Sequence, residues 1–133
     1  PHAILGQMLN CAAALGNCQI IPGEMSAGSV KSDHYDTALL FSVLHHVEDP
    51  RSLSTAVDEA GFRRLLIETK PHEEGFSFKD GHWKRSGGWK LNSWRALHSH
   101  LEAMFPGYRF NRSYGEYERG RQVLEFVRAP KPD

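Results

Sequence analysis

The sequence predicts an α/β fold with a mostly parallel sheet that ends in an antiparallel hairpin. Two nearly continuous apolar runs, residues 35–44 and 64–69, have the composition of strands that helices cover on both faces. A helical stretch between them would supply the crossover of a right-handed βαβ unit. Two alternating runs, residues 108–117 and 122–127, predict the closing hairpin.

The helix between the two apolar runs is marked at both ends. Asp49 is a typical N-cap residue, Pro50 suits the first helical position, and Gly61 suits the end of a helix. One apolar stripe joins these ends and consists of Leu53, Ala56, Val57 and Ala60. The stripe predicts a helix that packs on the sheet.

Three further segments complete the predicted order. Residues 3–15 have helical apolar spacing, and residues 18–21 form a short β-rich run. Asn92 or Ser93 can cap a third helix whose apolar face ends before Pro106. The stretch from Lys70 to Lys90 mixes aromatic residues with glycines and charges and has no clear period, which predicts a functional loop or lid.

Composition excludes several classes of protein. The chain has 133 residues with a formal net charge of zero, and no apolar run approaches the length of about 18 residues that a membrane span needs. The two cysteines form no CxxC pair, and the histidines lack the i, i+4 spacing of a helical zinc site. We therefore expect a cytoplasmic protein with no membrane segment and no metal.

The segment YDTALLFSVLHHVEDP at residues 35–50, followed by LLIET, resembles the fourth and fifth conserved segments of class I S-adenosylmethionine-dependent methyltransferases. The predicted element order agrees with that family from its second helix onward. The resemblance implies a Rossmann-like methyltransferase sheet with strand order 3-2-1-4-5-7-6, and S-adenosylmethionine as cofactor.

The family's first strand and its GxGxG loop have no counterpart in the sequence, so the resemblance implies an N-terminally incomplete fold. Residues 1–128 would form a partial methyltransferase domain, and residues 129–133 a tail. Three explanations stay open. The sequence is cut from a longer polypeptide, a second chain or an upstream segment completes the sheet, or the family fold is rearranged.

The resemblance also implies a cofactor site at the carboxyl ends of the strands. Glu24 stands where the family accepts the adenine amino group, and Met25 would pack on the purine. Phe41, Ser42 and Leu44 would lie beside the methionine part of the cofactor. A surface carboxylate and ordinary strand termination are the simpler interpretations of these residues.

His45 and His46 are the candidate catalytic residues, since an imidazole can accept a proton from a hydroxyl or amine acceptor. Adjacent residues point in different directions, so at most one faces the site. Some relatives, including small-RNA 2′-O-methyltransferases, bind a metal through ExxEH at this position. This chain has SVLHH, which puts that metal site in doubt. Histidines bonded to backbone at a strand end are the structural alternative.

Acceptor-binding residues are expected beyond the next strand. Glu68 ends that strand and His72 follows it, while Trp83 and Trp89 lie among basic residues and would stack on a planar substrate. A solvated loop and core tryptophans are the alternatives.

The sequence thus predicts a methyltransferase acting on a small-molecule or RNA acceptor, with activity that requires the missing N-terminal segment. The alternative is a non-catalytic Rossmann-like interaction or regulatory module that has lost the cofactor site.

Overall fold

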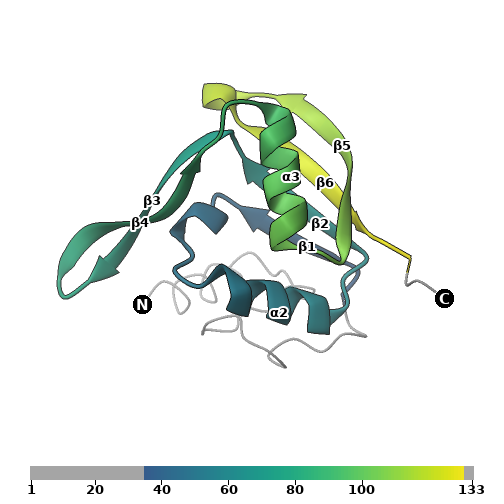
Figure 1. Cartoon of the computed structure of the whole chain (residues 1–133), viewed down its shortest axis with the longest axis horizontal. Helices are drawn as coiled ribbons and strands as arrows, with labels where there is room; N and C mark the ends of the chain where they lie inside the picture. The colour runs from purple at the N-terminus through teal and green to yellow at the C-terminus, as the bar shows by residue number, and fades with distance from the viewer. Residues whose placement is uncertain (1–34, 131–133) are drawn as a thin grey trace, which may run out of the picture.

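The computed structural model describes residues 35–130, which form a four-stranded sheet, a separate two-stranded hairpin and two α-helices (Figure 1). Glu24, Met25, the predicted helix at residues 3–15 and the predicted strand at residues 18–21 lie outside the described residues. The described elements, in chain order, are β1 (Thr37–Phe41), α2 (Pro50–Ala60), β2 (Arg64–Thr69), β3 (His72–Lys79), β4 (His82–Lys90), α3 (Trp94–Met104), β5 (Tyr108–Glu116) and β6 (Gln122–Arg128).

The larger sheet has the strand order β1-β2-β6-β5. β1 and β2 run parallel, with Leu39 opposite Leu66, which confirms the central βαβ prediction. β6 pairs antiparallel with both β2 and β5, so the predicted C-terminal hairpin is confirmed as well. This order matches the last four positions, 4-5-7-6, of the sheet that the resemblance implies. The described sheet is mixed, and a parallel majority would need strands from outside residues 35–130.

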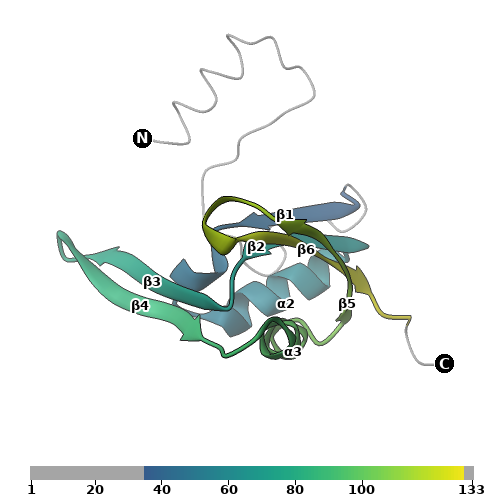
Figure 2. The ribbon, with the colours of Figure 1, turned by 90° about the horizontal axis from the view of Figure 1, so that it is seen from above.

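Both helices lie on one face of the larger sheet (Figure 2). Alternate strand residues point toward them, and those at the centre of this face are fully buried: Leu65, Ile67, Leu124 and Phe126. On the other face Leu39 and Phe41 are 62% and 44% exposed. Among the described residues, no strand pairs with the outer edge of β1. The core therefore lies between the sheet and the two helices.

The helix ends agree with the predicted caps. The Asp49 carboxylate accepts hydrogen bonds from the backbone N–H groups of Arg51 and Ser52, and Gly61 ends α2 in the left-handed conformation. Ser93 caps α3 by accepting from the Ala96 N–H. None of the helices in residues 35–130 is long and apolar enough to cross a bilayer.

Residues 70–90 differ from the sequence prediction of a loop. They form the hairpin β3–β4, which pairs with itself rather than with the larger sheet and projects from the body of the fold (Figures 1 and 2). Its two-residue turn is Asp80-Gly81, and both residues have positive φ, as a type I′ hairpin turn requires. This turn chemistry gives the segment a regular structure despite its irregular hydrophobic pattern.

Candidate functional site

The carboxyl end of β1 is shaped by an unusual backbone conformation. Ser42 has a φ of 52°, in the left-handed region that non-glycine residues seldom adopt, and this ends the strand earlier than its apolar run predicts. A short 3-10 turn, Leu44–His46, follows. In this turn Leu44 and His45 are buried, whereas His46 is exposed.

Polar side chains from distant parts of the sequence meet at the carboxyl ends of β1 and β2. Ser42 Oγ donates to Glu68 Oε2 at 2.6 Å, and the Tyr117 hydroxyl donates to the other oxygen of Glu68. Arg121 Nη1 donates to Ser42 Oγ at 3.0 Å. We call Ser42, Glu68, Glu73, Tyr117 and Arg121 the strand-end cluster. Ligands of open α/β sheets bind at this edge.

Arg121 and Glu73 form an ion pair in the cluster, and it is less exposed than the other ion pairs of residues 35–130. Arg121 Nη1 lies 2.8 Å from Glu73 Oε1, and Nη2 donates to Oε2 at 3.1 Å. The Glu73 side chain is 4% exposed and that of Arg121 is 20% exposed. Burial raises the pKa of Glu73, and the positive charge of Arg121 opposes this rise. The pair joins the turn after β5 to the base of the hairpin.

His45 lies behind this cluster in a nearly dry environment. The residue is 5% exposed, and its Nδ1 has no hydrogen-bond partner among the described residues. Burial, followed by the charges of His46 and Arg121, lowers the pKa of His45 to about 4, while Glu68 acts in the opposite direction. The imidazole is therefore neutral at physiological pH.

We expect the His45 ring to remain uncharged down to about pH 4 because its charged form would be poorly solvated. Following the imidazole carbon-bound protons by NMR during an acid titration measures this midpoint. A midpoint near 6.5, the value of an unperturbed histidine, would contradict the burial that we describe.

The same shift makes folding sensitive to acid. The unfolded chain binds a proton at His45 near pH 6.5, whereas the folded chain resists it until about pH 4. Above pH 6.5 His45 therefore does not change the free energy of unfolding. As the pH falls from 6.5 to about 4, it lowers this free energy progressively. Urea titrations at pH 7 and pH 4.5 should show a smaller acid loss for His45→Gln than for the unmodified protein.

His46 has a different position and different partners. Its Nδ1 lies 2.8 Å from the backbone oxygen of Phe76 and 3.2 Å from the backbone nitrogen of that residue, so it fastens the 3-10 turn to β3. Its ring also borders a cavity of about 760 Å³ beside β1 and the start of α2, whose wall includes Leu39, Val43, Glu48 and Asp49. The two histidines thus differ in burial and in partners, but they do not point apart as predicted, because their ring centroids lie 4.1 Å from each other.

No protein-family model matches the sequence, and no curated protein matches it significantly. Solved structures do resemble the fold. Mitomycin 7-O-methyltransferase MmcR has a TM-score of 0.59 at 19% identity, with 96% of this chain and 39% of that chain covered. Magnesium protoporphyrin IX methyltransferase (ChlM) from Synechocystis PCC 6803, with bound SAM, has a TM-score of 0.53 at 18% identity.

The fold of this chain is similar to that of solved methyltransferases. The SAM complex of ChlM is matched over 93% of this chain and 52% of that chain, and the ChlM complex with SAH over 93% and 57%. The chain therefore spans about half of ChlM and less than half of MmcR. The strand-end cluster lies at the carboxyl ends of the parallel strands β1 and β2, the edge at which open α/β sheets bind ligands.

The other predicted site residues occupy varied places in the methyltransferase fold. Phe41 points away from the helices beside Glu68, whereas Leu44 is a core residue and can offer a ligand only its backbone. His72 is exposed at the start of β3. Trp83 is 70% exposed toward the far end of the hairpin.

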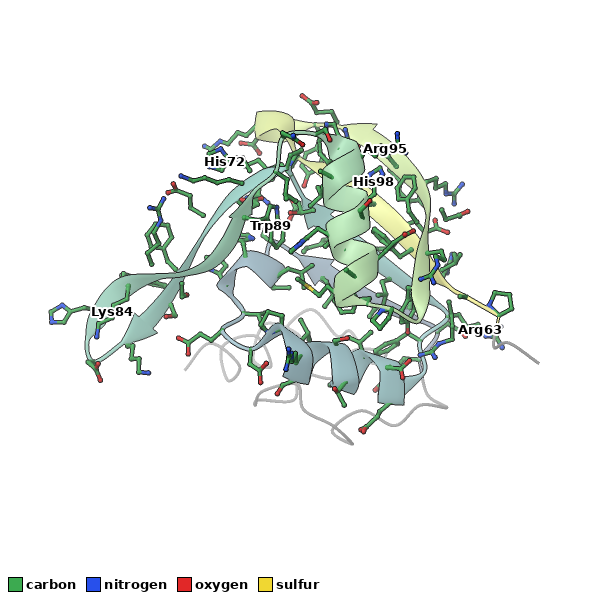
Figure 3. All side chains as sticks on the ribbon, viewed as in Figure 1. Arg63, His72, Lys84, Trp89, Arg95 and His98 are labelled. Carbon is green, nitrogen blue, oxygen red and sulfur yellow. The ribbon has the colours of Figure 1, made fainter. Side chains whose placement is uncertain are left out.

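Trp89 lies at the base of the hairpin beside α3, well away from Lys84 near the tip (Figure 3). It is buried in the core, and its indole Nε1 donates to the backbone oxygen of Lys70 at 2.9 Å. The two tryptophans therefore do not come together, and Trp89 matches the alternative of a core tryptophan.

Tyr117 and Arg121 were missed as site residues. They come from the turn between β5 and β6, and Arg121 lies 79 positions from Ser42 in the sequence. A charged turn residue carries no local signal of such a contact, because only the strand order brings the turn to this edge. Residues 35–130 contain no group of three or more side chains suited to hold a metal.

Proposed function

We propose that this chain forms the C-terminal part of an S-adenosylmethionine-dependent methyltransferase domain, with His45 as general base. An upstream segment or a second chain would supply the remaining strands of the sheet. The proposal extends to a methyl acceptor with a hydroxyl or amine group, on a small molecule or an RNA.

One observation carries the proposal: a perturbed histidine stands at the carboxyl end of β1 in a sheet with the strand order β1-β2-β6-β5, which agrees with the order 4-5-7-6 that the resemblance implies. A strongly shifted pKa is a common property of functional residues. His45 does not line the cavity beside β1, but the adjacent His46 does, and the two ring centroids lie 4.1 Å apart. The likeness to MmcR and ChlM shows the fold alone, since the identities are 19% and 18%. The chemistry of the site must therefore support the activity.

The cavity beside β1 suits part of a cofactor. Its volume of about 760 Å³ lies within the range of roughly 300–1,000 Å³ found for small-molecule sites. The carboxylates of Glu48 and Asp49 lie on its wall and would favour the cationic sulfonium and ammonium groups of S-adenosylmethionine. Phe41, Ser42 and Leu44 do not line this cavity, so their contact with the methionine part stays a prediction, as do the contacts of Glu24 and Met25 with the adenine.

S-adenosylmethionine would supply an electrophilic methyl group, and the side chains of this chain would prepare the acceptor. A neutral His45 can take the proton that an acceptor hydroxyl or amine loses. Glu68 is already a hydrogen-bond acceptor for Ser42 and Tyr117, and it could orient an acceptor hydroxyl in the same way. His72 and Trp83 remain candidates for outer contacts with a larger acceptor.

The named substrates of the similar structures favour a small-molecule acceptor over RNA. MmcR is a mitomycin 7-O-methyltransferase, and ChlM is a magnesium protoporphyrin IX methyltransferase. Two basic side chains of β4 also have acidic partners, since Lys84 pairs with Asp80 and Arg85 with Glu74. Paired charges offer less attraction to a phosphate backbone.

Titration calorimetry with S-adenosylhomocysteine on the full-length protein tests the proposal. We expect saturable binding with a dissociation constant in the micromolar range, near −8 kcal/mol, because a buried nucleoside ligand makes both apolar and polar contacts. Adenosine alone serves as the control and should bind more weakly. No heat change at millimolar S-adenosylhomocysteine would reject the enzyme and favour the non-catalytic module.

A further inference from the structure

The base of the hairpin β3–β4 closes directly over the backbone of His45. A Cβ atom added to Gly75 would lie 1.6 Å from the His45 carbonyl oxygen, and one added to Gly87 would lie 2.9 Å from the same oxygen. Such distances require glycine, because a side chain would overlap backbone atoms. The hairpin and the 3-10 turn therefore touch without intervening side chains. The His45 ring lies beside the same hairpin, with its centroid 6.5 Å from that of Trp89, and the residue is 5% exposed.

Arg121 ties this hairpin base to the end of β1, in addition to the contact of His46 Nδ1 with the Phe76 backbone. One guanidinium nitrogen reaches both Ser42 Oγ, at 3.0 Å, and Glu73 Oε1, at 2.8 Å, while the other reaches Glu73 Oε2 at 3.1 Å. Glu73 precedes Gly75 by two residues in β3. A planar fork with fixed donors holds a carboxylate in one orientation better than an ammonium group does.

We propose that Arg121 is a positioning residue for His45, because it fixes the hairpin base that encloses the imidazole at the end of β1. This inference rests on the catalytic role of His45 proposed above, and it assigns no contact between Arg121 and a substrate. Arg121 would act through Glu73 and Ser42. Its loss would let water reach His45 and change the environment in which that residue works.

Other contacts keep the hairpin attached when Arg121 is removed. Trp89 is anchored in the core through its ring, and His46 Nδ1 contacts the Phe76 backbone of β3. The loss of Arg121 should therefore loosen the part of the base around Glu73 and Gly75 while β1, β2 and β6 stay paired. A local effect of this kind is measurable by hydrogen exchange.

The charged neighbours of His45 shift its pKa, so an NMR titration of this residue responds to the loss of any one of them. His46, Arg121 and Lys70 lower its pKa, and Glu68 raises it. Arg121→Gln removes one positive charge and reduces the burial of the ring, and both changes move the midpoint upward. We expect an NMR midpoint higher by about one unit. We also expect amide exchange at residues 73–76 to be about tenfold faster, with little change in the larger sheet.

Two variants separate position from charge. Arg121→Lys keeps the positive charge but lacks the planar fork. The His45 midpoint of this variant should lie between those of the unmodified protein and Arg121→Gln. Its amide exchange at residues 73–76 should be nearly as fast as in Arg121→Gln. Glu73→Gln cuts the same contact from the other side and should also speed exchange at the hairpin base. Arg85→Gln is the matched control. It removes an exposed ion pair with Glu74 of the same hairpin and should leave the His45 midpoint unchanged.

The proposal is overturned if Arg121→Gln and Glu73→Gln both leave the His45 midpoint and the exchange of residues 73–76 at their original values. It is also overturned if exchange rises equally in every strand, since that result describes a general loss of stability. If Arg121→Gln fails to fold, Glu73→Gln and Arg121→Lys still decide the question. None of these measurements needs a ligand, so failure of S-adenosylhomocysteine binding would be recognised separately.

Discussion

Replacing Gly75 by alanine should displace the hairpin base and lower the free energy of unfolding by about 3 kcal/mol, the upper end of what overpacking usually costs. The added methyl group would lie 1.6 Å from the His45 carbonyl oxygen and 1.9 Å from that of Ser86. Both obstacles are backbone atoms, which cannot rotate away as a flexible side chain could. The hairpin must therefore move as a unit or lose its pairing at this point.

Urea denaturation measures the loss, and Gly81→Ala is the matched control. Gly81 lies in the turn of the same hairpin with a φ of 76°, and an added Cβ meets nothing within 4 Å. Its replacement should cost about 1 kcal/mol, from backbone strain alone. Equal costs for the two variants would mean that Gly75 is not pressed against the 3-10 turn.

The tight contact at Gly75 also links stability to the site. A displaced hairpin base would uncover His45, so Gly75→Ala should raise the midpoint of this residue as well as weaken the fold. The same variant thus reports on packing and on the environment of the candidate base.

The predictions made from apolar patterns agree best with the structure. The apolar runs predict β1 and β2, although Leu39 and Phe41 on one face of β1 are exposed among the described residues. Asp49 and Gly61 mark the ends of α2. The end of β1 was placed too late. Val43 and Leu44 continue the apolar run, but the left-handed Ser42 redirects the backbone before them.

The hairpin β3–β4 was expected to be a loop although a signal for it was present. Asp80-Gly81 is among the strongest two-residue hairpin signals, because both residues tolerate the positive φ of a type I′ turn. The glycines at positions 75, 87 and 88 obscured the alternating pattern. Their role is to let backbone approach backbone at the hairpin base, a requirement that arises only in the folded chain.

The candidate site could be predicted in part. Ser42 and His45 follow a buried strand, and that position alone places them at the functional edge of an α/β sheet. Arg121 and Tyr117 could not be placed in this way, because their contacts depend on β6 inserting between β2 and β5. Strand order is a property of the whole sheet, whereas sequence patterns report local structure.

Replacement of His45 by glutamine should reduce methyl transfer by about 10²- to 10⁴-fold, the usual contribution of a general base, which corresponds to roughly 2.7–5.5 kcal/mol of activation free energy. Glutamine fills a similar volume and can form hydrogen bonds, but it cannot take up a proton. Because His45 is proposed to act on the acceptor, the affinity for S-adenosylhomocysteine should change little. Transfer of a labelled methyl group from S-adenosylmethionine to a panel of phenols and amines measures the rate, and calorimetry measures the affinity.

His46→Gln is the comparison that gives this experiment its meaning. His46 is exposed, and its Nδ1 contacts the backbone of Phe76, so its loss should affect the hairpin more than the proton transfer. We expect a rate decrease of less than about tenfold for this variant. A larger effect at His46 than at His45 would reverse the assignment, because it would place the base on the wall of the cavity beside β1 instead of behind the strand-end cluster. Comparable and small effects at both positions would mean that alignment of the acceptor, without a histidine base, accounts for the rate.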